Sequence, residues 1–159
     1  MGREIRMVPP NWEHPKKENG EYMSMYDKDY DTAAQEWLDG LVKWNEKPEK
    51  EKYSCKYFWE YEGNPPNKEL YRPKFTEPAT WYQVYQTVSE GYPVTPPFAT
   101  TEELVDYLVE HGDFWDQKRG HGGYSREAAE AFVNSGWAPS FVFNPQEGVM
   151  GGIEAAGKK

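Results

Sequence analysis

The chain has 159 residues, a length that fits a single domain over residues 1–159 with a buried core. Its formal net charge of −9 argues against general nucleic-acid binding and against binding to an anionic membrane. The same charge permits a basic protein partner, or it serves solubility alone. Aromatic residues make up 16% of the chain, so we expect rings to build much of the core or to line a binding surface.

The N-terminal residues 1–30 read as an arm of short strands and loops. Residues 3–8 alternate polar and apolar side chains and predict a strand that Pro9 and Pro10 stop. The patch Met23–Met25 predicts a second short strand, which would pair with the first as a hairpin. The N-terminus has no apolar run typical of a signal peptide, and no stretch is long enough to span a membrane.

The first predicted helix covers residues 31–45. Thr32 and Gln35 have the spacing of a capping box, and apolar residues recur at helical spacing after it. Residues 46–80 follow as an irregular, proline-rich segment. This segment holds Cys55, the single cysteine, so no intrachain disulfide can form, and we expect a reducing, cytoplasmic setting.

The clearest local signals lie between Thr80 and Gly112. Residues 81–86 alternate as a strand, with Trp81, Gln83 and Tyr85 on one face. A proline-rich loop follows. A helix then begins with a capping box over residues 100–103 and ends at Gly112.

The C-terminal part predicts one more helix and a hairpin. Ser125 is a plausible N-cap and Gly136 a plausible end for the helix. Two short strands, Ser140–Phe143 and Val149–Ile153, flank a turn, and residues 157–159 form a frayed tail. The predicted class is α+β, with a small antiparallel sheet of short strands, about three helices packed on one side of it, and long proline-rich loops.

The most suggestive candidate site is the stretch QKRGHGGYSR, which we call the glycine loop. It places cations beside three glycines at the start of a helix, where exposed amides favour anions. It lacks the P-loop pattern, so an ordinary mobile loop and a phosphate or carboxylate site both stay open. With the strand and loop before it, the candidate ligand-binding residues are Trp81, Tyr85, Ser89, Glu90, Lys118, Arg119, His121, Gly122, Gly123, Ser125 and Arg126.

Catalytic and metal motifs do not stand out. The histidines lack metal-ligand spacing, and His111 suits the C-terminal end of a helix. Asp113, Asp116 and Glu90 are carboxylates of the kind that acid–base catalysis uses, but nothing in their spacing singles out a pair. We therefore expect no metal and no cofactor, and we assign no catalytic residue.

The sequence contains the stretches WYQVYQTVSEGYPVTPPFATTEELVDYL, HGDFWDQ, GGYSREAAEAFVNSGWAPS and VMGGIEAA, and it has REIRMVPPNWEHP near its N-terminus. In these stretches it resembles a widespread family of small proteins encoded by bacteriophages and prophages. The resemblance covers most of the chain and is weakest over residues 46–70. It implies no catalytic residues. It implies a phage accessory protein in the bacterial cytoplasm, and such proteins often blunt host defence.

The expected function is therefore a non-enzymatic binder or inhibitor that counters bacterial antiviral defence. It would occlude a host defence protein, which the acidic charge favours, or sequester a nucleotide-like immune signal, which the glycine loop and the rings favour. A small phage enzyme acting on a phosphorylated or nucleotide substrate is an alternative, and a virion or morphogenesis component is another. The many rings also make a homodimer plausible.

Overall fold

The computed structural model describes residues 2–48, 55–87, 90–139, 141–145 and 148–156. The chain divides into two compact units, and each is described by itself. The first unit comprises Met1–Ser24 and Phe75–Lys159, and the second comprises Met25–Lys74. The single domain over residues 1–159 stays a prediction.

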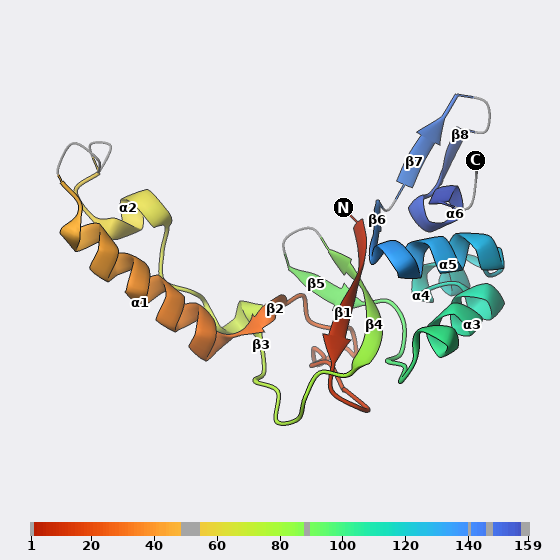
Figure 1. Ribbon diagram of the computed structural model, residues 1–159, viewed down its shortest axis with the longest axis horizontal. Helices are drawn as coiled ribbons and strands as arrows, with labels where there is room; N and C mark the ends of the chain where they lie inside the picture. The colour runs from red at the N-terminus through yellow and green to blue at the C-terminus, as the bar shows by residue number, and fades with distance from the viewer. Residues whose placement is uncertain (1, 49–54, 88–89, 140, 146–147, 157–159) are drawn as a thin grey trace. The chain divides into compact units, whose positions relative to one another are not determined.

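The first unit contains a four-stranded sheet, a two-stranded hairpin and helices (Figure 1). Its strands are β1 (Gly2–Val8), β4 (Trp81–Thr87), β5 (Gly91–Pro93), β6 (Trp137–Pro139), β7 (Phe141–Asn144) and β8 (Gly148–Gly151). Its helices are α3 (Thr101–His111), α4 (Phe114–Arg119), α5 (Arg126–Ser135) and α6 (Gly152–Ala156). The α+β class is confirmed.

The larger sheet has the strand order β5-β4-β1-β6, with every neighbouring pair antiparallel. Strand β1 therefore lies between two partners that are distant in sequence, and Ile5 lies opposite Val84 in β4. The predicted antiparallel sheet and its strands over residues 3–8 and 81–86 are confirmed. The predicted hairpin between β1 and Met23–Met25 is wrong, because β4 and β6 occupy both edges of β1.

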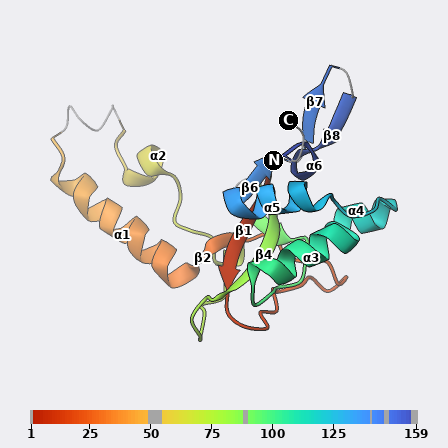
Figure 2. The same ribbon diagram turned by 45° about the vertical axis from the view of Figure 1, so that its right-hand side comes forward.

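Helices α3 and α5 pack with β4 to make the core, and Figures 1 and 2 show the two helices side by side. Leu104, Leu108 and Phe132 are fully buried there beside Val84. The predicted N-caps form: Thr100 accepts from the amide of Glu103 at 3.1 Å, and Ser125 accepts from the amide of Ala128 at 3.1 Å. The capping box predicted over residues 100–103 is only half formed, because the Glu103 carboxylate accepts from the amide of Ala99 at 3.1 Å. Both predicted helices are thus confirmed.

The C-terminal hairpin joins β7 to β8, with Val142 opposite Met150. It confirms the two predicted strands, although Ser140 and the predicted tail 157–159 lie outside the described residues. The second predicted strand ends earlier than expected, because residues 152–156 turn into α6. Helix α4 was not predicted from the sequence at all.

The second unit contains β2 (Tyr26–Asp29), α1 (Tyr30–Glu46), α2 (Phe58–Glu62), a 3-10 turn (Lys68–Leu70) and β3 (Tyr71–Arg72). The predicted helix over 31–45 is confirmed, but its predicted capping box is wrong. Asp29 is the N-cap, and its carboxylate accepts from the amide of Thr32 at 3.0 Å. The helix begins one residue earlier than predicted, at Tyr30, because β2 ends at Asp29 and the chain enters the helix directly.

Within this unit β2 and β3 pair in parallel. An ion pair of 3.1 Å joins Asp27 to Arg72 across them. Helix α2 packs its buried Phe58 against Trp37 of α1, with ring centroids 4.9 Å apart. The segment 46–80, predicted as irregular, thus carries three short elements among its described residues. No helix in the described ranges is long and apolar enough to cross a membrane.

Candidate functional site

The glycine loop connects α4 to α5 and is held by backbone hydrogen bonds. The amide of His121 donates to the carbonyl of Asp116 at 2.9 Å, and the amide of Tyr124 donates to the carbonyl of Leu108 at 3.0 Å. A Cβ on Gly123 would lie 1.9 Å from the carbonyl oxygen of Val109 in α3. Gly123 therefore allows the backbone of the loop to approach the backbone of α3 closely, and this contact holds the loop on α3.

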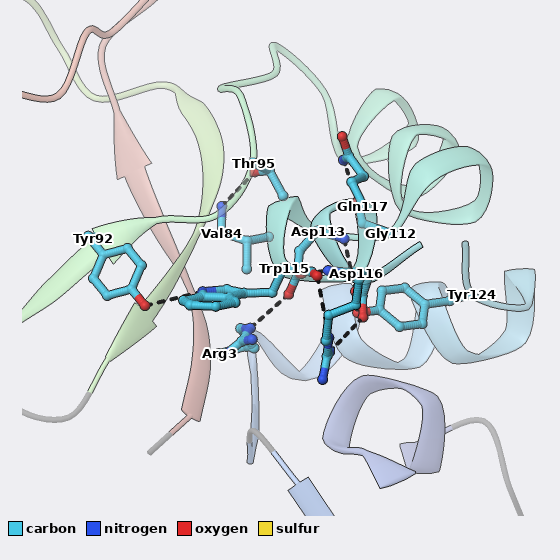
Figure 3. Close-up of polar contacts among 11 residues, drawn as sticks. Arg3, Val84, Tyr92, Thr95, Gly112, Asp113, Trp115, Asp116, Gln117 and Tyr124 are labelled. Atoms are coloured by element: carbon cyan, nitrogen blue, oxygen red, sulfur yellow. Dashed lines mark hydrogen bonds and ion pairs between the residues drawn. The ribbon is translucent and has the colours of Figure 1, made fainter. Parts of the chain in front are cut away.

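A network of carboxylates lies under this loop (Figure 3). Asp113 and Asp116 cap α4 reciprocally: each carboxylate accepts from the other residue's amide, at 2.9 and 3.1 Å. Arg3 of β1 donates to the second oxygen of Asp113 at 2.8 Å. Tyr124 and Arg119 both donate to Asp116. All four carboxylate oxygens of the pair thus accept at least one hydrogen bond.

Burial sets the protonation behaviour of this network. Desolvation raises the pKa of Asp113, although the Arg3 guanidinium opposes the rise. For Asp116, desolvation is outweighed by hydrogen bonds from Tyr124 and from the amide of Asp113, so the pKa of Asp116 is lowered. Burial and the nearby carboxylates raise the pKa of Tyr124, which stays a donor. With its oxygens occupied, the pair fixes α4 and the loop rather than offering a base to a substrate.

The structure brings four of the predicted ligand residues together at this loop. His121, Gly122, Gly123 and Ser125 line a cavity of about 330 Å³. Asp116, Tyr124 and Glu154 complete its lining. The walls therefore include carboxylates, which the sequence analysis did not place beside the loop.

Both arginines of the glycine loop are paired with acids. Arg119 contacts Asp116 at 3.2 Å, and Arg126 contacts Asp106 at 2.9 Å and Glu130 at 3.9 Å. Their charges are thus partly neutralised by neighbours from α3, α4 and α5. The pairs Arg119–Asp116 and Arg126–Glu130 have helical i,i+3 and i,i+4 spacing, whereas the pair with Asp106 joins residues that are distant in sequence.

The predicted residues of β4 and the loop after it lie elsewhere in the first unit. Tyr85 is buried, its hydroxyl donates to Gln83 at 3.0 Å, and the Arg6 guanidinium lies 4.7 Å from its ring centroid. Its ring is therefore closed to a ligand. Trp81 is half-buried at the start of β4, and Glu90 is half-buried just before β5. Ser89 lies outside the described residues.

A second cavity is richer in rings and has two lysines in its lining. We call it the aromatic cavity; its volume is about 420 Å³. It is lined by residues of the loop after β1, of β5 with the residue that follows it, and of α4: Lys17, Glu21, Tyr22, Ser24, Tyr92, Pro93, Val94, Phe114, Trp115 and Lys118. Of the predicted ligand residues that the structure describes, Lys118 alone lines this cavity.

Trp115 is at the centre of the polar contacts in the aromatic cavity. Its indole N–H donates to the Tyr92 hydroxyl at 3.2 Å, as Figure 3 shows. The Lys118 ammonium lies 5.5 Å from the centroid of the Trp115 ring, within range of a cation–π interaction. Trp115 is still 39% exposed, so much of its ring remains open to a ligand.

The wall formed by the loop after β1 is fixed by a buried histidine. His14 is 4% exposed, and its Nε2 lies 2.7 Å from the carbonyl oxygen of Met23, a contact that requires a proton on Nε2. A β-bridge between Lys16 and Tyr22 closes the loop beyond it. Burial lowers the pKa of His14 to about 4, so the ring is neutral near pH 7.

Sequence reasoning missed this cavity because its lining comes from three distant segments. One signal was available: residues 113–116 read Asp-Phe-Trp-Asp, in which two acids three residues apart form the capping box of α4. That box predicts a helix that places Trp115 and Lys118 one turn apart.

Within the described ranges, no group of three or more histidine, cysteine or acidic side chains is placed to hold a metal ion. Comparisons with models of protein families, with curated proteins and with solved structures found no match for this chain.

Proposed function

We propose that this protein is a non-enzymatic binding protein that holds a small nucleotide-like ligand in the aromatic cavity. The observation that carries the proposal is the lining of that cavity, where Trp115 and Tyr22 offer rings and Lys17 and Lys118 offer positive charge. Base stacking on aromatic side chains and ammonium contacts to phosphate are the usual elements of nucleotide recognition. A cavity of about 420 Å³ falls within the size range of small-molecule sites.

We further propose that the protein is phage-encoded and works in the bacterial cytoplasm, where it sequesters a nucleotide signal of antiviral defence. The sequence resemblance to phage and prophage proteins supports the setting. The aromatic cavity supports sequestration of a small ligand as the way in which the protein acts. The engaged state of Asp113 and Asp116 supports binding over catalysis, since their oxygens already accept hydrogen bonds within the protein.

Occlusion of a basic defence protein is the second candidate, and the charge distribution favours it. The first unit carries 16 acidic against nine basic residues, a formal charge of −7, within a chain of net −9. Such a field attracts a basic groove and speeds encounter with it.

Binding is tested with purified protein and a panel of mononucleotides and cyclic nucleotides. We expect a ligand from the panel to bind the native protein, to be lost from Trp115→Leu, and to be retained by Trp59→Leu. Trp59 is a matched control because it is 48% exposed, stacks on Tyr57 in the second unit and is not among the residues that line the cavity. Equal binding by both variants would refute the assignment of the aromatic cavity.

The fate of the ligand separates binding from catalysis. We expect mass spectrometry to recover the nucleotide intact after incubation and denaturation of the protein. A chemically altered nucleotide would identify an enzyme instead. In cells that carry defined defence systems, we expect the native protein to restore phage plating and Trp115→Leu to fail. Full activity of Trp115→Leu would favour occlusion of a protein over sequestration.

A further inference from the structure

We propose that the aromatic cavity selects ligands with one ring system and one phosphate group, such as a nucleoside monophosphate, over polyphosphates and longer nucleotides. This inference rests on the proposed function and specifies its ligand class. It follows from the rings, the hydrogen-bond donors, the charge and the volume of the cavity.

The cavity lining supplies two rings on which a base would stack. Trp115 on α4 and Tyr22 on the loop after β1 both line the cavity. Part of the Trp115 ring is already covered, because the Lys118 ammonium lies over it at 5.5 Å. The indole N–H is also engaged with Tyr92, which holds the ring in place. One pre-positioned indole can stack one planar base at low entropic cost.

The donors suit one phosphate group. The Tyr92 hydroxyl accepts from the indole, so its own proton is available to a ligand acceptor. Lys118 has no carboxylate within ion-pair distance in the described part of the chain, and its ammonium retains donors for an anion. Lys17 contributes a second ammonium, shared with Glu21 at 3.9 Å.

The charge balance disfavours further phosphates. Two lysines and one glutamate line the cavity, which leaves a local charge of about +1. No arginine lines it among the described residues, so the planar fork that suits clustered phosphates is missing there. A triphosphate would place additional negative charge beside Glu21 and within a chain of net −9. One phosphate can be matched by these groups, and three cannot.

The volume agrees with this limit. At about 420 Å³ the cavity lies at the lower end of the range of roughly 300–1,000 Å³ typical of small-molecule sites. A base with its ribose and one phosphate fits that range, whereas a second nucleotide would extend beyond the walls.

The test compares four adenine probes with the native protein: AMP, adenosine, ATP and the dinucleotide pApA. Binding is followed by calorimetry and by the fluorescence change on titration, and CMP, GMP and UMP are tested beside AMP. We expect a nucleoside monophosphate to bind about tenfold or more tightly than its nucleoside, as charge-assisted hydrogen bonds to phosphate imply. We also expect it to bind more tightly than the triphosphate and the dinucleotide.

Variants then assign the phosphate contact. We expect Lys118→Met to lose most of the preference for monophosphate over nucleoside while nucleoside binding remains. Lys74→Met, an exposed lysine of the second unit, should keep that preference. Tighter binding of ATP or pApA through Trp115, or an unchanged preference in Lys118→Met, overturns this inference and leaves the proposed function standing. Binding of no nucleotide, cyclic nucleotides included, overturns both.

Discussion

Protonation of His14 should destabilise the fold as the pH falls from neutral, and the structure sets the size of the effect. The ring is 4% exposed and donates from Nε2 to the Met23 carbonyl, and its pKa is lowered from 6.5 to about 4 by burial and by the Arg6 charge. The unfolded chain therefore binds a proton at a higher pH than the folded protein does. The stability that neutral His14 contributes is fully present above pH 6.5 and is lost as the pH falls toward 4.

The magnitude follows from the pKa difference, since one unit is worth about 1.4 kcal/mol. At pH 5 the histidine should cost about 2 kcal/mol of the free energy of unfolding, and near pH 4 about 3 kcal/mol. Burial raises the pKa of Asp113, so protonation of this carboxylate also changes stability in acid, and the comparison needs a variant that lacks only the imidazole. His14→Gln keeps an N–H that can reach the Met23 carbonyl and cannot be protonated.

The assay is urea unfolding of both proteins at pH 7.5, 6 and 5, followed by circular dichroism. We expect the native protein to lose about 2 kcal/mol more than His14→Gln between pH 7.5 and 5. The loop that His14 holds carries Lys17 and Tyr22, so ligand binding at the aromatic cavity should weaken in parallel. If the free energy of unfolding fell equally with pH in the two proteins, the assignment of His14 as a buried, neutral histidine would be wrong.

Two further predictions concern the anchoring of the glycine loop and the network below it. Gly123→Ala should destabilise the first unit by about 3 kcal/mol or more, because its Cβ would lie 1.9 Å from a backbone oxygen of α3, whereas Gly122→Ala meets nothing within 4 Å and should be tolerated. Equal melting temperatures for the two variants would contradict this packing. Arg3→Met should cost about 3–5 kcal/mol in urea unfolding by leaving Asp113 buried without its charge partner. The added change Asp113→Asn should restore part of that loss; no recovery would mean that Arg3 acts through packing.

Local signals were sufficient for the elements that organise the first unit. The helix beginning at Thr101 could be predicted because Thr100, Glu103 and Gly112 act within a few residues of its ends. Strand β4 could be predicted because its alternation reflects the pleat of its own backbone. The same holds for α5, with Ser125 and Gly136 at its ends. In each case the deciding interactions join neighbours in the chain.

The partners of these elements were decided by the tertiary structure. Strand β1 pairs with β4 and β6, which lie far along the chain, and no local pattern names those partners. The glycine loop reads as basic in sequence, yet folding brings Glu154 to its cavity and Asp106 to Arg126. These acidic residues beside the glycine loop, and the contacts with α3 that hold the loop, therefore come from segments that are distant in sequence.

The aromatic cavity shows the same division. Sequence alone established an acidic, ring-rich α+β chain and included Lys118 among eleven candidate ligand residues. Tertiary structure decided that Lys118 lines one cavity with Tyr22 and Tyr92, together with Trp115 from its own helix. The physical reason is that a binding site needs groups within a few ångströms in space, whereas composition and periodicity report only on neighbours along the chain.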